Sequence, residues 1–320
     1  MTIQPPRISV AIPLYRSAPF VDNVSANIEA MPPGIEILVS DRHLYDDAID
    51  RLEKRHRGDR RLVFLRHRDG RDWIDHINDL LRQARGEYWR LLPHDDFTSG
   101  KALNALVGCL DEHPETLLAY GPTFSEDLDG NRLPGRQYPD PHPITDEDPW
   151  TLGLALDTHW RGHFSGAFKG LLRREWVVER GLWIRRTLGT VHAERAWLAP
   201  LAALGRFRFV PDAAYIKRFH PESTHAGWRP GVSHELSVWR VLRAYFRDLV
   251  PERPIYRAAR GYLAWTTALR LNWLRRPDPL PPPTEPTLPV EGPPIFQRSF
   301  DRLLDRWRKA HHWQASSVDS

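Results

Sequence analysis

The sequence contains a single cysteine, Cys109, among its 320 residues. One cysteine excludes an intrachain disulfide and a zinc site built from cysteines, so we interpret Cys109 as a small core residue. No stretch approaches the roughly 18 apolar residues that a membrane-spanning helix needs. Residues 1–7 do not show the basic and then apolar pattern of a signal peptide. These absences predict a protein of the cytoplasm.

An excess of charge of one sign is also missing. The chain has 45 Lys and Arg against 41 Asp and Glu, which leaves a formal net charge of +4 and gives little support to a nucleic-acid partner. Lysine is rare, with only five among the 45 basic residues. Hydrophobic residues make up 41% of the chain and 13 residues are Trp, so we expect a globular protein with a large core.

The first 120 residues alternate strand and helix patterns. The stretch from Trp73 to Ala84 repeats apolar residues at the spacing of one helix face. Ser17 and Ser99 stand where each can cap the helix that follows. Repeated strand and helix units predict an α/β fold, in which helices cover both faces of a mostly parallel sheet. The expected strands are residues 8–12, 35–39, 62–65, 88–92 and 116–120.

The pattern changes after residue 120. Residues 121–150 are rich in Gly, Pro and Asp and show no period, which predicts a long surface loop. Helical patterns return at 173–180, 193–204 and 237–274, and short strand patterns at 207–210 and 214–219. We therefore expect an α/β domain over 1–225, a helical extension over 226–276, a proline-rich linker over 277–294, and an amphipathic helix and tail over 295–320.

Several common site motifs are absent from the sequence. The first strand is not followed by the G-x-G-x-x-G of dinucleotide-binding proteins, and Gly100 and Lys101 lack the upstream glycine of a phosphate-binding loop. The serine within residues 162–166 stands one place too late for a nucleophile elbow. His159 and His163 have the spacing of a metal pair, but no carboxylate lies nearby in the sequence. We interpret both as loop or surface residues.

Two adjacent carboxylates, Asp95 and Asp96, follow the expected strand 88–92. The carboxyl ends of the strands form the edge at which open α/β sheets bind ligands. Mg²⁺ is usually held there by one or two carboxylates together with substrate phosphates. Adjacent aspartates are often plain turn residues, but their position between a strand end and a capped helix predicts a metal site.

Segments in order along the chain carry a resemblance to a known family. They are residues 8–15, residues 36–41 ending in Asp41, Asn78 with residues 84–88, and the carboxylate motif at 92–96. In these segments the sequence resembles the family 2 glycosyltransferases, which have the GT-A fold and use nucleotide-sugar donors. Residues 205–211 and 217–220 resemble the end of that family's catalytic domain. The resemblance covers about residues 8–225, some two thirds of the chain.

This resemblance implies roles for individual residues. Asp41 would accept a hydrogen bond from the nucleobase, Asp95 would reach the ribose or the metal, and Asp96 would bind a Mn²⁺ or Mg²⁺ ion beside the diphosphate. Tyr15 and His220 are equally compatible with purely structural roles, as a core aromatic and a packed histidine. The other implied contacts are Pro13, Tyr15 and Asn78 to the nucleotide, and His220 to the metal or a phosphate.

Two departures from the family's pattern concern the donor and the base. Residues 41–46 lack the second acidic residue and the Gly-Ser turn of many members, so the resemblance does not imply a particular nucleobase or donor sugar. Where the family usually has Glu-Asp, with the Asp as general base, this chain has Glu194 and Arg195, and arginine cannot take up a proton. We predict that Glu194 is the base; the alternative is an acidic residue that only favours a helix N-terminus.

The sequence thus predicts a metal-dependent inverting glycosyltransferase, with UDP as the expected nucleotide of the donor and a glycan or lipid-linked acceptor in polysaccharide synthesis. Trp160, His163 and the loop 121–150 would border the acceptor or serve as ordinary packing and loop residues. One rival is a non-catalytic nucleotide- or glycan-binding protein on the same fold. Another is a sugar-1-phosphate nucleotidyltransferase, but residues 13–19 lack the glycine-rich phosphate cradle that its chemistry needs.

The expected last helix, residues 296–313, has an apolar stripe that includes Phe296, Phe300 and Trp307, and it is basic elsewhere. Its apolar face would dock on the catalytic domain or on a second subunit in a homodimer. Alternatively, the helix lies on the inner face of an anionic membrane and brings the enzyme to its acceptor. Asp301 and Asp305 reduce the local positive charge and weaken the membrane interpretation.

Overall fold

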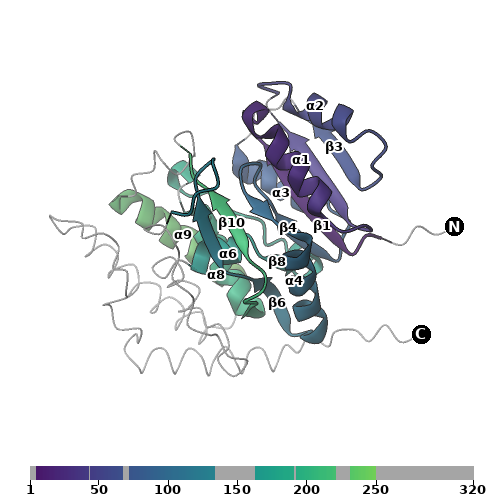
Figure 1. The fold of residues 1–320 in the computed structure, drawn as a ribbon. Helices are drawn as coiled ribbons and strands as arrows, with labels where there is room; N and C mark the ends of the chain where they lie inside the picture. Colours follow the sequence, from purple (N-terminus) through teal and green to yellow (C-terminus); the bar gives the residue numbers. More distant parts are fainter. Residues whose placement is uncertain are drawn as a thin grey trace.

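The computed structural model describes residues 5–42, 44–67, 72–133, 163–190, 192–220 and 231–249. Figure 1 shows this part as strands with helices packed around them. The strands are β1 (Ile8–Leu14), β2 (Glu36–Asp41), β3 (Leu62–Arg66), β4 (Tyr88–Leu91), β5 (Phe97–Thr98), β6 (Thr116–Tyr120), β7 (Thr123–Glu126), β8 (Leu171–Arg173), β9 (Arg206–Phe209) and β10 (Tyr215–Arg218). The helices are α1 (Val21–Ala30), α2 (Ala48–Arg55), α3 (Trp73–Gln83), α4 (Gly100–Glu112), α6 (His163–Phe168), α7 (Arg174–Val178), α8 (Ala193–Leu204) and α9 (Val232–Leu249), with 3-10 turns η1 (Ala18–Phe20) and η3 (Leu188–Thr190).

The larger sheet has seven strands in the order β3-β2-β1-β4-β8-β6-β9. β1 lies parallel to β2 and β4, β2 lies parallel to β3, and β6 lies parallel to β9, so the predicted mostly parallel α/β sheet is confirmed. β8 is antiparallel to both of its neighbours, β4 and β6. Because the chain adds β2 and β3 on one side of β1 and β4 on the other, a switch point of the kind that binds ligands lies between β1 and β4.

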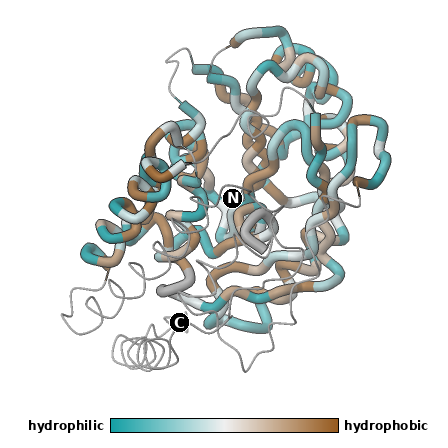
Figure 2. Tube along the Cα trace, turned by 90° about the vertical axis from the view of Figure 1, so that its left-hand side faces the viewer, coloured by the Kyte–Doolittle hydropathy of each residue, from teal (hydrophilic) through white to brown (hydrophobic). Residues whose placement is uncertain are grey.

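Two apolar cores lie on the two faces of this sheet. Val10 and Ile12 of β1 pack with buried residues of α1, α2 and α4, whereas Ala11 between them packs with α3 and α8 on the other face. This alternation follows from the two-residue period of a strand. Figure 2 shows how hydrophobic and hydrophilic stretches alternate along the described chain. Burial on both faces fixes the positions of the strand ends, where the sequence predicts ligand binding.

A second sheet has three strands in the order β5-β10-β7. β10 pairs antiparallel with β5 and parallel with β7. The prediction of an unbroken loop over 121–150 was therefore wrong for Thr123–Glu126, because polar residues form a strand there when β10 supplies the hydrogen-bond partners. Residues 134–150 lie outside the described residues.

Two serines were predicted to cap helices, and one of them does so. The Ser99 hydroxyl accepts a hydrogen bond from the Ala102 amide at 3.1 Å, at the start of α4. The expected cap by Ser17 was wrong, because its hydroxyl instead accepts the amide of Tyr15 at 2.8 Å and lies 3.1 Å from Nδ1 of His94. Ser17 therefore ties the end of β1 to the loop after β4.

Helix boundaries differ from the sequence patterns in the second half of the chain. The predicted helix 173–180 is shorter, because residues through Arg173 are taken into β8 and α7 ends at Val178. α9 begins at Val232, five residues before the predicted start at 237, and it packs on α8 with Tyr245 and Phe246 buried. Residues 250–276, the linker 277–294 and the tail 295–320 lie outside the described residues. Within the described ranges, no helix combines the length and apolar character needed to cross a membrane.

Candidate active site

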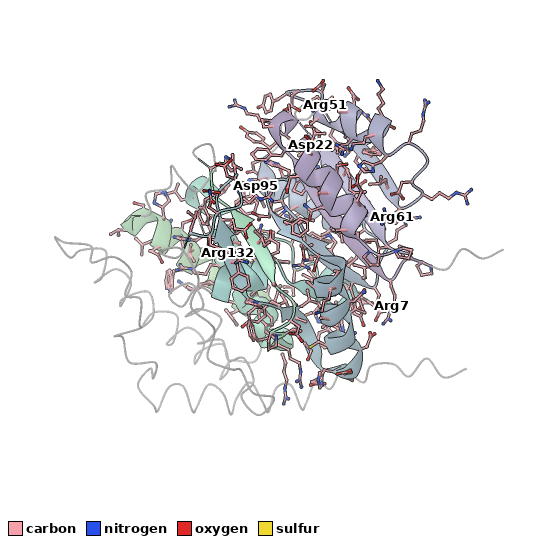
Figure 3. All side chains as sticks on the ribbon, in the orientation of Figure 1. Arg7, Asp22, Arg51, Arg61, Asp95 and Arg132 are labelled. Atoms are coloured by element: carbon pink, nitrogen blue, oxygen red, sulfur yellow. The ribbon has the colours of Figure 1, made fainter. Side chains whose placement is uncertain are left out.

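The carboxyl ends of β1, β2 and β4 meet at one edge of the larger sheet. Leu14 at the end of β1 is the register partner of Asp41 at the end of β2, and Leu92, directly after β4, donates its amide to the Ala11 carbonyl at 2.9 Å. Asp95 follows within a few residues. Figure 3 shows Asp95 between the N-terminal helices and the second sheet. The edge predicted to hold the ligand is therefore the place where the two sheets approach each other.

Asp95 and His220 lie within hydrogen-bond distance of each other at this edge. The antiparallel pairing of β10 with β5 brings the residues after β10 beside the loop after β4. His220 Nε2 lies 3.1 Å from Asp95 Oδ2. Burial acts to raise the pKa of Asp95, but the hydrogen bond with His220 and the charge of His94 outweigh it and leave the pKa below its usual range. Asp95 is therefore an ionised carboxylate at a strand end.

Asp96 is more deeply buried than Asp95 and has different partners. Its carboxylate accepts the Tyr215 hydroxyl on Oδ2 and the Arg218 amide on Oδ1, the latter at 3.0 Å. Burial raises the pKa of Asp96 to about 6, and the charge of Asp95 acts in the same sense. Because both oxygens already accept hydrogen bonds from the protein, this arrangement favours Asp95 over Asp96 as the carboxylate open to a metal.

Glu194 lies in the first turn of α8, as the predicted bounds 193–204 imply. The side chain is buried, and its Oε2 has no hydrogen-bond partner in the part of the chain that the structure describes. Burial raises the pKa of Glu194 to about 7, although the charges of Lys169, Lys217 and Arg195 oppose the shift. A buried carboxylate oxygen without a partner needs an explanation, and a substrate hydroxyl would supply one.

The charge of Lys169 interacts with those of Asp96, Asp95 and Glu194. The sequence analysis did not identify this lysine as a site residue. β8 runs antiparallel to β4, so Lys169, just before β8, lies by the carboxyl end of β4, and its carbonyl accepts Arg90 Nε at 2.9 Å. Burial lowers the pKa of Lys169 to about 8, while the charges of Asp96, Asp95 and Glu194 act to raise it. The sequence offered one indication of a special role for Lys169, which is that lysine is rare in a chain whose basic residues are mostly arginine.

Two exposed tyrosines stand at the ends of β1 and β2. Tyr15 and Tyr45 are 47% and 54% exposed, and their rings pack edge to face with centroids 5.5 Å apart. The Arg16 guanidinium lies 5.7 Å from the Tyr15 ring and 5.4 Å from the Tyr45 ring. Asp41, buried nearby, accepts the Leu44 amide at 2.8 Å. Exposed rings beside a strand-end carboxylate suit a nucleobase, and the sequence analysis missed Tyr45.

Other predicted positions have structural partners. The Asn78 amide donates to the Ile184 carbonyl at 2.9 Å and accepts the Ile184 amide at 2.8 Å, so it joins α3 to the segment after α7 rather than facing the strand ends. Pro13 lies within β1, one residue before its end. Arg42, in the segment 41–46 that departs from the family's pattern, is buried and paired with Asp79 of α3.

Arg195, at the position expected to hold the family's base, is also buried in an ion pair. Its Nη2 lies 2.7 Å from Oε2 of Glu235 on α9. Trp160 and His159 lie outside the described residues, as does the side chain of His163. In the ranges described, no three His, Cys, Asp or Glu side chains gather as a metal cluster.

The larger sheet, its switch point and the charged groups at the strand ends define a Rossmann-like α/β protein with a candidate ligand site at this edge. The sequence profile of glycosyl transferase family 2 matches residues 9–180, more than half of the chain. The chain therefore belongs to glycosyl transferase family 2, and the protein is a glycosyltransferase. No curated protein matches the sequence.

Solved structures of low sequence identity share the fold. Residues 1–349 of S. aureus TarS in complex with UDP-GlcNAc match with a TM-score of 0.61 and 15% identity, over 81% of this chain and 72% of that one. The same TarS fragment with UDP matches with a TM-score of 0.57 and 14% identity, over 96% and 93%. The mannosyltransferase PcManGT from Pyrobaculum calidifontis, in complex with GDP-Man and Mn²⁺, matches with a TM-score of 0.51 and 18% identity, over 98% and 89%. The predicted GT-A fold is confirmed.

Proposed function

We propose that the protein transfers a sugar, with inversion, from a nucleotide diphosphate-sugar to an acceptor hydroxyl, with a divalent cation bound beside the diphosphate. One observation carries the proposal: the charge of Lys169 acts together with those of Asp96, Asp95 and Glu194, and within the described residues Oε2 of the buried Glu194 has no hydrogen-bond partner. A base and a phosphate-binding group thus belong to one site. Transfer assays with a panel of UDP- and GDP-sugars and glycan or lipid-linked acceptors, with and without Mn²⁺, test it.

The donor would bind across the strand ends. Tyr15 and Tyr45 would contact the nucleobase, and Asp41 would accept a hydrogen bond from it, while Lys169 and Lys217 would face the diphosphate. Lysines suit this task because the ammonium is a compact charge with three donors. The complexes of structurally similar proteins with UDP-GlcNAc and with GDP-Man support a nucleotide-sugar donor here.

The residues at the site fit a hard divalent cation in type. Asp95 supplies an ionised carboxylate and His220 an imidazole nitrogen, 3.1 Å apart, and substrate phosphates would supply further oxygen ligands. When bound, Mn²⁺ or Mg²⁺ would offset the negative charge of the departing diphosphate. The ammonium groups of Lys169 and Lys217 would act in the same sense from the protein side.

Glu194 would accept the proton of the acceptor hydroxyl as that oxygen attacks the anomeric carbon opposite the departing diphosphate. Its raised pKa suits this role, because a general base is most effective when its pKa lies near the working pH. Arg195 cannot replace it, since its guanidinium stays charged and is held by Glu235.

Activity is expected to rise with pH across neutrality. The base must be ionised, so kcat/KM for the acceptor should increase as Glu194 loses its proton, with a midpoint near its pKa of about 7. A pH profile of kcat/KM from pH 5 to 9 checks this expectation. A rise completed by pH 5.5 would mean that an ordinary, solvated carboxylate acts as base.

Asp95→Asn is expected to weaken cation-dependent nucleotide binding. Loss of a ligand should cost at least the roughly 10–100-fold in metal affinity that loss of a supporting contact costs. Calorimetric titration of UDP and GDP, with Mn²⁺ and with chelator, measures the effect. Asp129→Asn, in an exposed turn after β7, is the matched control and should bind as the wild type does. Equal affinity of wild type and Asp95→Asn in Mn²⁺ would contradict the assignment.

A further inference from the structure

A buried acid of α9 faces the first turn of α8, where Glu194 stands. Glu235 directs Oε2 to Arg195 Nη2 at 2.7 Å, and its Oε1 lies 3.9 Å from His192 Nε2. The side chains of Arg195 and Glu235 are only 4% and 1% exposed. Both oxygens of Glu235 therefore lie near the two residues that flank Ala193 and Glu194 in the sequence.

The backbone that enters α8 is held in an uncommon conformation. Gly189, Thr190 and His192 have φ angles of 58°, 59° and 58°, in the left-handed region that residues other than glycine rarely adopt. Such a backbone persists only where surrounding contacts determine it. Trp73 Nε1 donates to the Thr190 hydroxyl at 2.8 Å, and the Leu188 amide donates to the hydroxyl of Ser237 on α9 at 2.7 Å. Helix α9 thus supports the segment before Glu194 and, through Glu235, the turn that contains it.

Among the described residues, the charged side chains with the largest effects on Glu194 are positive. They are Lys169, two residues before β8, Lys217 of β10 and Arg195 of α8 itself. Each of these cations favours the ionised form of Glu194 and so opposes the effect of burial. Glu235 pairs with Arg195, and the negative charge of Glu235 reduces the effect of Arg195 on the adjacent Glu194.

We propose that Glu235 is a positioning residue for the candidate base, holding the first turn of α8 against α9 and compensating the charge of Arg195 beside Glu194. This role rests on the proposed function, because it serves the reaction only if Glu194 is the base. It also gives the helical extension a part in the reaction, since α9 supplies the compensating charge.

The two charges can be removed separately and together in the full-length enzyme. Glu235→Gln leaves Arg195 uncompensated, so the midpoint of the kcat/KM profile should fall by about one pH unit. Arg195→Met leaves Glu235 unpaired, so the midpoint should rise by a similar amount. The double variant should return close to the wild-type midpoint, because both charges are gone. Glu235→Asp keeps the charge and should keep the midpoint, with lower kcat from the displaced turn.

A second measurement does not depend on turnover. The carboxyl carbon of Glu194, identified in ¹³C-glutamate-labelled enzyme by the signal that Glu194→Gln lacks, reports its titration directly. The NMR midpoint should move with the kinetic one in each variant. If Glu235→Gln does not fold, the rise in Arg195→Met still tests the proposal. An NMR midpoint unmoved in the folded single variants overturns the role of Glu235, whereas retained turnover in Glu194→Gln overturns the proposed function instead.

Discussion

Replacing Glu194 by Gln should reduce turnover by about 10²–10⁴-fold, the usual cost of losing a general base. The amide has nearly the same shape as the carboxylate but cannot accept the proton of an acceptor hydroxyl. Donor binding should stay close to wild type, because the nucleotide contacts proposed at Tyr15, Asp41 and Asp95 are untouched. Single-turnover transfer and calorimetric titration of the nucleotide separate the two effects.

A matched control for this variant is Glu112→Gln, at the exposed C-terminal end of α4. It makes the same chemical change away from the strand ends and should retain full turnover. The unfolding transitions of both variants should be compared with that of the wild type, so that a loss of fold is not taken for a loss of chemistry. If folded Glu194→Gln turns over as fast as Glu112→Gln, Glu194 is not the base.

Arg195→Asp is expected to destabilise the protein by about 3–5 kcal/mol, the range measured when one partner of a buried ion pair is removed. The change restores the acid that the family usually has at this position, but in this fold it sets a new carboxylate beside Glu235. Two buried carboxylates would repel each other, and Glu235 would lose its arginine partner. Urea unfolding of the purified variant measures the loss.

A companion variant exchanges the charges of Arg195 and Glu235 between the two helices. Arg195→Asp combined with Glu235→Arg restores opposite charges across α8 and α9, and it should recover a large part of the lost stability. A single variant as stable as wild type would mean that the pair contributes nothing to the fold. Because Arg195→Asp alone is expected to perturb the fold, its activity is informative only when it is measured beside the exchanged pair.

Much of the fold could be predicted from local patterns. The β-rich run at 8–12, the helix periodicity from Trp73 and the bounds 193–204 of α8 all match the structure closely. Each depends on which face of a short segment is apolar, and this information is carried by neighbours in the chain. Strand β7 was missed because this local signal is weak there: its residues show little apolar alternation, and its partner β10 is about 90 residues away.

The candidate site could be predicted only in part. Asp95 and Glu194 could be proposed from the sequence because one follows a strand and the other begins a helix, and these are local features. The pairing of Asp95 with His220 depends on the antiparallel register of β10 with β5. Lys169 reaches the site because β8 runs against β4. Neither register is encoded within one segment.

By itself, the sequence determined the α/β class, the edge of the sheet at which a ligand is expected, and the family whose motifs occupy that edge. These properties follow from hydrophobic periodicity and from short motifs, which act over a few residues. Only the tertiary structure decided the hydrogen-bond partners of Asp95 and Asp96, the lysine whose charge acts on them, and the partner of Arg195. Those outcomes depend on distances between segments up to 125 residues apart and on burial, which controls the pKa of Glu194 and Lys169.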